Sequence, residues 1–269
     1  MLRRRCQSTS RARFALQSRL INAPSITVLQ SCSPQRPAWV SSCLNGVESW
    51  ANSKSFDYFC LDDRFFDILP DWYREKLTGR GPILSDLARL LHLRNLLEQG
   101  ADAVIWLDAD TLIIDRDWSP SMPEHSLLGA ECWLQRNKRG KLEVKRQPHN
   151  AFMMFAKASP ILDFLIHTTQ SIIQRIDVDH IAPQVVGPKL LKALHPMADF
   201  DLEHKAAAMS TDLLVGLMEE DRDLLMFYRS AQLSPPASFN VCSSFHGIEA
   251  GVDLDLISNR VRQYLVDQK

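Results

Sequence analysis

The stretch that decides the fold is ADAVIWLDADTLIID, residues 101–115. Five apolar residues, 103–107, run directly into Asp108 and Asp110, which are one residue apart. The apolar neighbours place both carboxylates beside a hydrophobic core, where two like charges are costly unless a positive group offsets them. The stretch therefore predicts a buried strand that ends at a charged site.

If the strand continues through Asp108 and Asp110, both side chains point to the same face, because strand side chains alternate with a period of two. They then lie at the carboxyl end of the strand, where open α/β sheets bind ligands. A hard divalent cation, Mg²⁺ or Mn²⁺, relieves the repulsion and leaves coordination positions open for a substrate diphosphate. The alternative is a solvated turn or helix cap, where Asp-x-Asp tripeptides are common.

The helix before this strand carries a second charged pair. Residues 83–100, ILSDLARLLHLRNLLEQG, have leucines on one stripe and Gly100 as a stop signal. Asp86 and Arg89 are three residues apart and share a helix face, with Asp86 near the helix N-terminus, where the dipole favours a carboxylate. They form either a cap with an intrahelical ion pair or a site in which Asp86 accepts sugar hydroxyls and Arg89 holds a phosphate or sugar oxygen.

The pattern of the whole chain predicts an α/β fold. Strands at 25–30, 56–63 and 103–107 alternate with helical segments in the first 115 residues, which favours a mostly parallel central sheet flanked by helices. The second half is more mixed. We expect strands at 126–132, 150–156, 224–228 and 239–247, an exposed hairpin or loop at 134–144, and helices at 160–176 and 188–195.

Composition narrows the class of protein. A chain of 269 residues with 45% hydrophobic and 23% charged residues is typical of a globular enzyme, and the net charge of −1 gives no reason to expect nucleic acid as a partner. No apolar run is long enough for a transmembrane segment. The six cysteines are scattered without a metal-binding spacing, which predicts buried, reduced thiols and a cytoplasmic location, with peripheral membrane attachment as an alternative.

The N-terminal segment, residues 1–22, differs from the rest of the chain. It is rich in arginine and serine and has no acidic residue. This composition fits a disordered basic arm, a transit peptide or a start codon assigned too far upstream. We expect the segment to be poorly ordered and residues 23–269 to form one domain.

The residues around the two acidic pairs resemble a known family. SDLARLLHLRNLLEQGADAVIWLDADTLI (residues 85–113) is similar to the signature of glycosyltransferase family 32, in which an (A/S)-D-x-x-R helix leads through glycine into Y-L-D-x-D. The family includes bacterial capsule and lipopolysaccharide glycosyltransferases and fungal initiating mannosyltransferases, with the clostridial glucosylating toxins as more distant relatives. Further segments resemble the family in the right order over roughly residues 25–190. The motif positions are occupied here by Asp86, Arg89, Asp108 and Asp110.

Some positions depart from the family pattern. The first strand keeps Gln30 but lacks the tryptophan of the usual H-Q-x-W, a single glycine replaces the usual pair before the strand, and Trp106 replaces the motif tyrosine. These differences bear on the expected contacts to the nucleobase and on the identity of the donor more than on the expected metal site.

The resemblance implies the GT-A fold of nucleotide-diphospho-sugar transferases and a metal-dependent transfer from a nucleotide-diphosphate sugar donor to a glycan, lipid-linked or protein hydroxyl acceptor, with retention. It implies that Asp108 approaches the donor ribose or sugar, that Asp110 ligates Mn²⁺ or Mg²⁺, and that Asp86 and Arg89 hold the sugar. His246 in SSFHGIEAG is a candidate third metal ligand, or a surface or core histidine. Asn150 is a candidate for bonding the sugar, or a strand-end cap.

Two other classes remain open from the residues alone. A metal-dependent hydrolase or phosphotransferase would use Asp108 and Asp110 to activate water. A non-catalytic sugar-nucleotide-binding protein on the same fold would keep the site without turnover.

Overall fold

The computed structural model describes residues 24–177, 180–198, 200–242 and 253–266. In the first half of the chain, strands and helices alternate as the hydrophobic pattern predicts. The elements are β1 (Ile26–Ser31), α2 (Ala38–Ser53), β2 (Asp57–Leu61), the 3₁₀ helix η1 (Asp63–Ile68), α3 (Asp71–Lys76), α4 (Gly81–Glu98), β3 (Ala103–Leu107) and β4 (Thr111–Ile113).

The second half mixes long and short elements. They are β5 (Ser126–Arg136), β6 (Leu142–Ala156), α5 (Pro160–Arg175), α6 (Pro188–Leu194), β7 (Asp201–Glu203), β8 (Ala206–Ala208), α7 (Thr211–Glu219), α8 (Arg222–Ala231), β9 (Ser238–Asn240), α10 (Leu254–Val261) and the π-helix η3 (Arg262–Val266).

The central sheet has six strands in the order β2-β1-β3-β6-β5-β7. β1 is parallel to β2 and β3, and β7 is parallel to β5, whereas β6 is antiparallel to both of its neighbours. A second, three-stranded sheet has the order β4-β9-β8. The predicted α/β class, a mostly parallel central sheet with a mixed C-terminal half, is confirmed.

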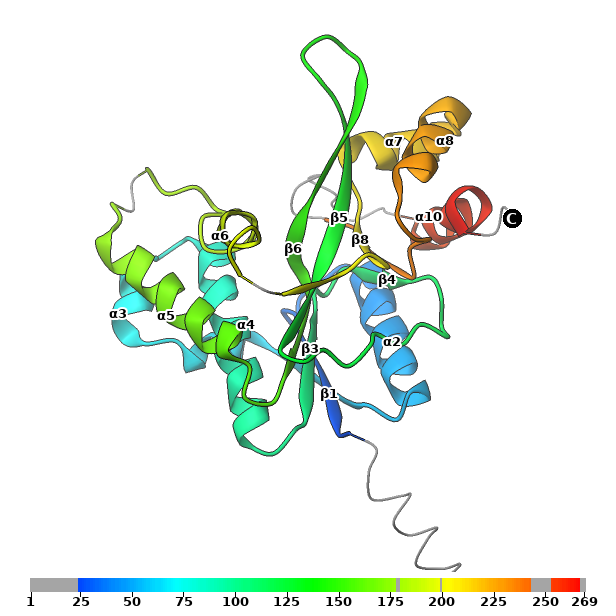
Figure 1. Ribbon diagram of the computed structural model, residues 1–269. Helices are drawn as coiled ribbons and strands as arrows, with labels where there is room; N and C mark the ends of the chain where they lie inside the picture. Colours follow the sequence, from blue (N-terminus) through cyan, green and yellow to red (C-terminus); the bar gives the residue numbers. More distant parts are fainter. Residues whose placement is uncertain (1–23, 178–179, 199, 243–252, 267–269) are drawn as a thin grey trace, which may run out of the picture.

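Helices cover both faces of the central sheet (Figure 1). The alternation along β3 explains the two layers, because neighbouring side chains point to opposite faces. Val104 and Trp106 pack into the cluster with α3, α4 and α5, whereas Ile105 and Leu107 pack into the cluster with α2. β3 is buried along its whole length, so its carboxyl end delivers Asp108 to an edge of the core.

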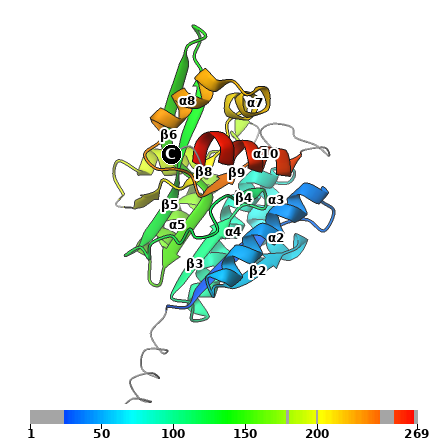
Figure 2. The same ribbon diagram turned by 90° about the vertical axis from the view of Figure 1, so that its right-hand side faces the viewer.

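A third cluster anchors the C-terminal part of the chain. α7, α8 and α10 pack over β4 and β9, on the same side of the central sheet as α2 (Figure 2). The strand predicted at 224–228 is wrong, because these residues belong to α8. Asp221 caps that helix by accepting a hydrogen bond from the Leu224 amide at 3.0 Å, and a helix buries Leu224, Leu225 and Tyr228 on one side. A short apolar run does not distinguish a strand from a helix by itself.

β5 and β6 continue into a long hairpin that extends beyond the body of the protein (Figure 1). Of the exposed hairpin or loop predicted at 134–144, the structure shows the hairpin, and the strands on either side are longer than predicted. Its turn lies at Asn137–Lys141, where Gly140 has a φ of +72° and the Asn137 side chain accepts from the amides of Arg139 and Lys141.

Three further predictions have mixed outcomes. Of the strand predicted at 239–247, the structure shows β9, ending at Asn240, and residues 243–247 lie outside the described part, as does the basic segment 1–22. The five described cysteines are free thiols, but of these only Cys43 is buried as predicted; Cys32, Cys132 and Cys242 are half-buried and Cys60 is exposed. Within the described residues, no helix is long and apolar enough to cross a membrane.

Candidate functional site

β3 ends at Leu107, so the strand does not continue through both aspartates, and the alternative of a turn holds. The chain turns instead, and the Thr111 amide donates to the Asp108 carbonyl at 3.1 Å. Buried Gln30, from the neighbouring strand β1, also donates to this carbonyl, at 3.0 Å, and accepts from the Tyr58 hydroxyl at 2.9 Å. The two aspartates therefore sit on a tight turn that side chains from β1 and β2 hold in place.

The Asp108 carboxylate receives two hydrogen bonds from the α4 side of the sheet. Arg89 Nη1 lies 3.2 Å and Trp106 Nε1 2.7 Å from Asp108 Oδ1. Within the described part of the chain both bonds end on Oδ1, so Oδ2 is the oxygen left for a ligand. The side chain keeps 30% of its surface exposed.

Arg89 links α4 to the end of β3 and to β6. Besides Asp108, it contacts Asp86 Oδ1 at 3.5 Å and donates to the Asn150 carbonyl at 2.9 Å. Its guanidinium also lies 5.0 Å from the centre of the Trp106 ring. The Asp86–Arg89 pair is thus an intrahelical ion pair, which is one of the two alternatives drawn from the sequence. Arg89 also connects this pair to Asp108 and Asn150 at the edge of the sheet.

Asp86 is buried, at 6% exposure, and lies in the second turn of α4, not near its N-terminus as predicted, because the helix begins at Gly81. Burial raises the pKa of this carboxyl to about 6, while Arg89 and a 2.7 Å hydrogen bond from Asn150 Nδ2 act in the opposite direction. Gly187 lies against it, since a Cβ there would be 2.5 Å from Asp86 Oδ2. This close approach explains the glycine before α6.

Asn150 lies in a bulge of β6. The register with β5 shifts from Leu128↔Met153 to Gly129↔His149, which leaves the residues between His149 and Met153 without partners on β5. Buried His149 secures the bulge by bonding the Ala206 carbonyl at 2.9 Å and the Ala151 amide at 3.2 Å. Bulges re-aim side chains beside functional sites, and this one directs Asn150 to Asp86.

Asp110 is held from the other sheet. β4 pairs with β9 so that Thr111 lies opposite Asn240, and Asn240 Nδ2 donates to Asp110 Oδ1 at 2.6 Å. Asp110 is half-buried, and its carbonyl accepts from the Val241 amide at 3.0 Å. Sequence reasoning missed Asn240, since its only signal was a polar residue inside a short apolar run.

One pocket of about 860 Å³ brings these residues together. It is lined by Asp86, Arg89, Asp108, Asp110 and Asn150, with Asn240 beside them. Six carboxylates and four cationic side chains line it, so acidic groups exceed basic ones. The carboxylates are Asp62, Asp63, Asp86, Asp108, Asp110 and Glu131, and the cations are Arg36, Arg89, Lys145 and Lys192.

The chemistry of this lining fits a divalent cation. Two carboxylates on one turn supply the oxygen ligands that Mg²⁺ and Mn²⁺ prefer, and the excess of acidic groups favours a bound positive charge. Among the described residues, no group of three or more His, Cys, Asp or Glu side chains is arranged to hold a metal ion. The third predicted ligand, His246, lies outside the described residues.

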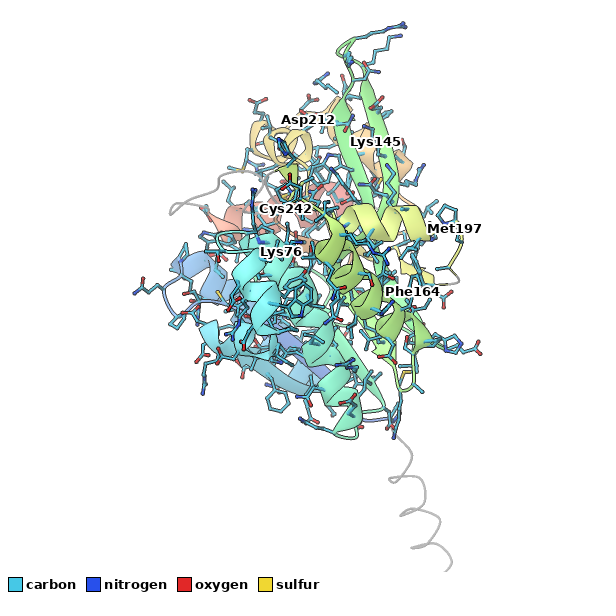
Figure 3. The ribbon with its side chains drawn as sticks, turned by 90° about the vertical axis from the view of Figure 1, so that its left-hand side faces the viewer. Lys76, Lys145, Phe164, Met197, Asp212 and Cys242 are labelled. Atoms are coloured by element: carbon cyan, nitrogen blue, oxygen red, sulfur yellow. The ribbon has the colours of Figure 1, made fainter. Side chains whose placement is uncertain are left out.

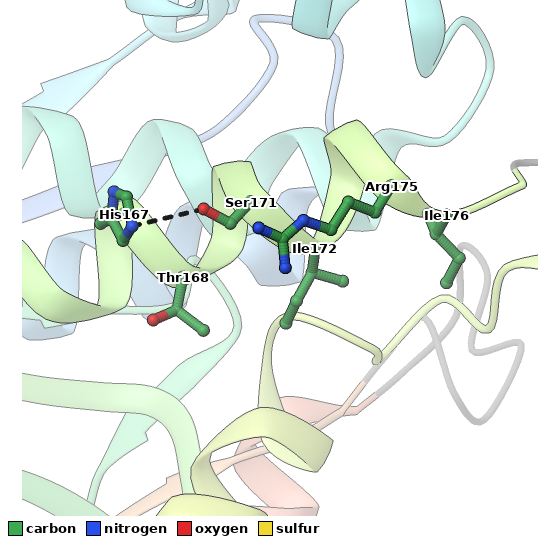
Figure 4. A pocket seen from close by; sticks show the side chains of 6 residues that line it. All are labelled: His167, Thr168, Ser171, Ile172, Arg175 and Ile176. Carbon is green, nitrogen blue, oxygen red and sulfur yellow. Dashed lines mark hydrogen bonds between the residues drawn. The ribbon is translucent and has the colours of Figure 1, made fainter.

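A second pocket, of about 540 Å³, differs in chemistry. His167, Thr168, Ser171, Ile172, Arg175 and Ile176 line it, all from α5 or its end (Figure 4). His167 and Ser171 are 3.4 Å apart and bonded to each other. This lining contains no carboxylate and none of the residues that the sequence motifs single out.

Comparisons with known proteins give distant structural likenesses. The sequence matches no protein-family model and no curated protein. The fold is similar to a glycosyltransferase involved in the glycosylation of the major capsid of PBCV-1, with a TM-score of 0.45 and 11% identity over 89% of this chain and 100% of that one. It is also similar to the PaToxG glycosyltransferase, with a TM-score of 0.41 and 12% identity over 96% of this chain and 95% of that one.

A third likeness is weaker. Mannose-1-phosphate geranyltransferase from Thermus thermophilus matches with a TM-score of 0.29 and 10% identity, over 61% of this chain and 67% of that one. These scores are too low to carry a functional conclusion, which has to come from the geometry of the site.

Proposed function

We propose that this protein is a metal-dependent glycosyltransferase of GT-A type, which moves a sugar from a nucleotide-diphosphate donor to a hydroxyl acceptor. The observation that carries the proposal is the bonded network of Asp86, Arg89, Asn150 and Asp108, which lines the same pocket as Asp110 at the carboxyl end of β3. Ligands of open α/β sheets bind at this edge. The sequence resemblance to family 32 supports the proposal, because its motif positions correspond to Asp86, Arg89, Asp108 and Asp110.

The protein residues divide into ligands and positioning groups. Asp110 and Oδ2 of Asp108 are the proposed metal ligands, with His246 as the third. A bound Mn²⁺ or Mg²⁺ would stabilise the negative charge that develops on the departing diphosphate. The guanidinium N–H groups of Arg89 already contact Ser85, Asp86, Asp108 and Asn150. We therefore assign Arg89 to holding the Asp86 and Asp108 carboxylates in place.

The sugar and the diphosphate need different partners. Asp86 and Asn150, bonded to each other, are the proposed contacts for the sugar hydroxyls, since a carboxylate accepts and an amide both donates and accepts. Arg36 and Lys192 are exposed cationic side chains of the pocket lining, and we assign them to the diphosphate. Holding both halves of the donor orients its anomeric carbon toward the acceptor.

The proposed reaction retains the anomeric configuration. The bond between the anomeric carbon and the diphosphate oxygen breaks, and a bond to the acceptor oxygen forms on the same face. The acceptor proton passes to the departing diphosphate. Within the described residues, the carboxylates of the network, Asp86 and Asp108, are engaged by Arg89, which disfavours either as a covalent nucleophile.

A thermal-shift screen tests the proposal. UDP-, GDP- and CDP-sugars are added to the full chain with and without Mn²⁺, and one donor is expected to raise the melting temperature only with the metal. Asp110→Asn should abolish this shift, whereas Asp117→Asn, which removes one exposed carboxylate after the turn, should preserve it.

Product analysis separates the classes of activity. The active donor is then incubated with pooled hydroxyl acceptors, and an α-linked product from an α-linked donor supports retaining transfer. Release of free sugar at the same rate without an acceptor would instead identify a hydrolase, and a metal-dependent shift without turnover would identify a binding protein.

A further inference from the structure

The pocket continues onto one face of the β5–β6 hairpin. Side chains alternate along β5, and Glu131, Trp133 and Gln135 line the pocket. The residues between them face the other way, where Leu134 is buried in the cluster with α7 and α8 and Cys132 packs against it. The α7–α8 side of the hairpin is therefore core, and the opposite side is a wall of the pocket.

Trp133 lies in the middle of a polar row on this wall. The residues opposite it and its neighbours on β6 are Gln147, Lys145 and Glu143. Gln147 Nε2 donates to Glu131 Oε1, and Gln135 Nε2 donates to Glu143 Oε1 at 2.6 Å. Two amide–carboxylate pairs thus flank the indole along the hairpin.

Lys145 lies directly across from Trp133. Its Nζ is 3.8 Å from Glu143 Oε1, and its side chain is 53% exposed. Figure 3 shows Lys145 on the hairpin and Cys242, which lines the same pocket, below it. The wall therefore extends from the part of the pocket beside Asp110 and Asn240 out along the hairpin.

This arrangement has the chemistry of a saccharide subsite. A sugar ring has an apolar C–H face, which packs on an aromatic ring, and hydroxyls at its rim, which both donate and accept hydrogen bonds. Half-buried Trp133 supplies the apolar surface. The paired amides and carboxylates supply fixed donors and acceptors at its sides.

We propose that the β5–β6 hairpin binds the acceptor and that the acceptor is a saccharide chain, with Trp133 as the ring that its sugars pack against. The inference rests on the proposed glycosyltransferase function and selects one of its three acceptor classes. A lipid-linked acceptor recognised through its tail would need a continuous apolar groove. The pocket-facing side of the hairpin instead carries five polar residues around one tryptophan.

The test measures saccharide binding without donor or metal. A panel of immobilised oligosaccharides, neutral and acidic, is probed with the full chain, and at least one is expected to bind. Trp133→Ala should weaken that binding about tenfold, whereas Trp133→Phe should restore most of it because a smaller aromatic face remains. Phe59→Ala, which removes an aromatic side chain 51% exposed on edge strand β2, is the matched control and should leave binding unchanged.

A second measurement uses turnover. With the active donor and a bound oligosaccharide, Trp133→Ala should raise the acceptor KM about tenfold. If Trp133→Ala fails to fold, Gln135→Ala on the same hairpin takes its place. This variant should also raise the acceptor KM. Unchanged acceptor KM in both variants, or no saccharide binding by a protein that still shows the metal-dependent donor shift, would overturn the acceptor assignment. Trp133-dependent saccharide binding without any donor shift would instead overturn the transferase proposal and leave the subsite standing.

Discussion

Arg89 Nη1 lies 3.2 Å from Asp108 Oδ1, and this bond joins the middle of α4 to the residue that follows β3. The same guanidinium contacts Asp86 at 3.5 Å. Both side chains of the intrahelical pair are less than 10% exposed. Arg89 is therefore a cation that the two carboxylates of this network share, and its removal leaves Asp86 buried without its compensating charge.

The first prediction concerns the stability that Arg89 provides. Arg89→Ala should lower the free energy of unfolding by about 3–5 kcal/mol, because breaking a buried ion pair leaves an uncompensated charge. Urea denaturation at pH 7.5 measures this. Arg94→Ala on the same helix is the control, since its contacts to Glu98 and Asp163 are exposed, and it should cost no more than about 0.5 kcal/mol. Equal losses in the two variants would rule out a buried network.

The second prediction follows from the pKa of Asp86, which burial raises to about 6 from the usual 3.8. Between these values the folded state binds more protons than the unfolded state, so the carboxylate makes stability fall as pH rises. Asp86→Asn does not titrate. The stability of Asp86→Asn relative to the native chain should therefore rise between pH 4 and pH 7, by about 3 kcal/mol.

Urea denaturation of both proteins at half-unit pH steps measures this difference. Asp57→Asn, at an exposed position on β2, is the control and should follow the native chain across the window. A difference between Asp86→Asn and the native chain that stays flat with pH would show that Asp86 is not desolvated.

The sequence predicted the first half of the fold well because its pattern was regular. The leucine stripe of α4 has a helical period. The apolar run before Asp108 is short but includes β-branched Val104 and Ile105 and is preceded by the stop signal Gly100, and both elements form as expected. The run at 224–228 was too short to have a period. The Asp221 cap and the packing against β4 and β9 favour a helix at this position.

The candidate site was only partly predictable. The motif indicated Asp86, Arg89, Asp108 and Asp110, Asn150 was a separate candidate, and all five line one pocket. The sequence offered a turn at Asp108 only as an alternative to a continuing strand, because the turn is held by Gln30, 78 residues away in sequence. Asn240 is 130 residues from Asp110, and such a contact arises from the pairing of β4 with β9, which local pattern does not encode.

The third prediction concerns the positioning of Asp110. Asn240→Ala removes the amide that fixes its carboxylate, and loss of a residue that orients a metal ligand usually weakens metal binding about 10–100-fold. Titration of Mn²⁺ with the active nucleotide sugar, followed by thermal shift, should show the higher metal requirement. Asn95→Ala, whose partner is Gln99 on the surface of α4, should titrate like the native chain. Identical curves for all three proteins would mean that Asp110 needs no support from β9.

The fourth prediction uses the close approach of Gly187 to the network. A Cβ at this position would lie 2.5 Å from Asp86 Oδ2 and 2.9 Å from Asn150 Nδ2, both shorter than real contacts allow. Gly187→Ala should therefore push Asp86 and Asn150 apart and weaken donor binding at least about tenfold, because their contacts to the sugar depend on that bond. Isothermal titration with donor and Mn²⁺ measures the loss.

The matched control for this variant is Gly46→Ala. Gly46 lies inside α2, and no atom lies within 4 Å of a Cβ built there. Alanine should raise the free energy of unfolding by about 0.5–1 kcal/mol, since glycine is a poor helix former, and leave donor affinity unchanged. If Gly187→Ala instead binds donor as tightly as Gly46→Ala, α6 must move away from Asp86 at little cost, and the Asp86–Asn150 bond would not depend on the glycine.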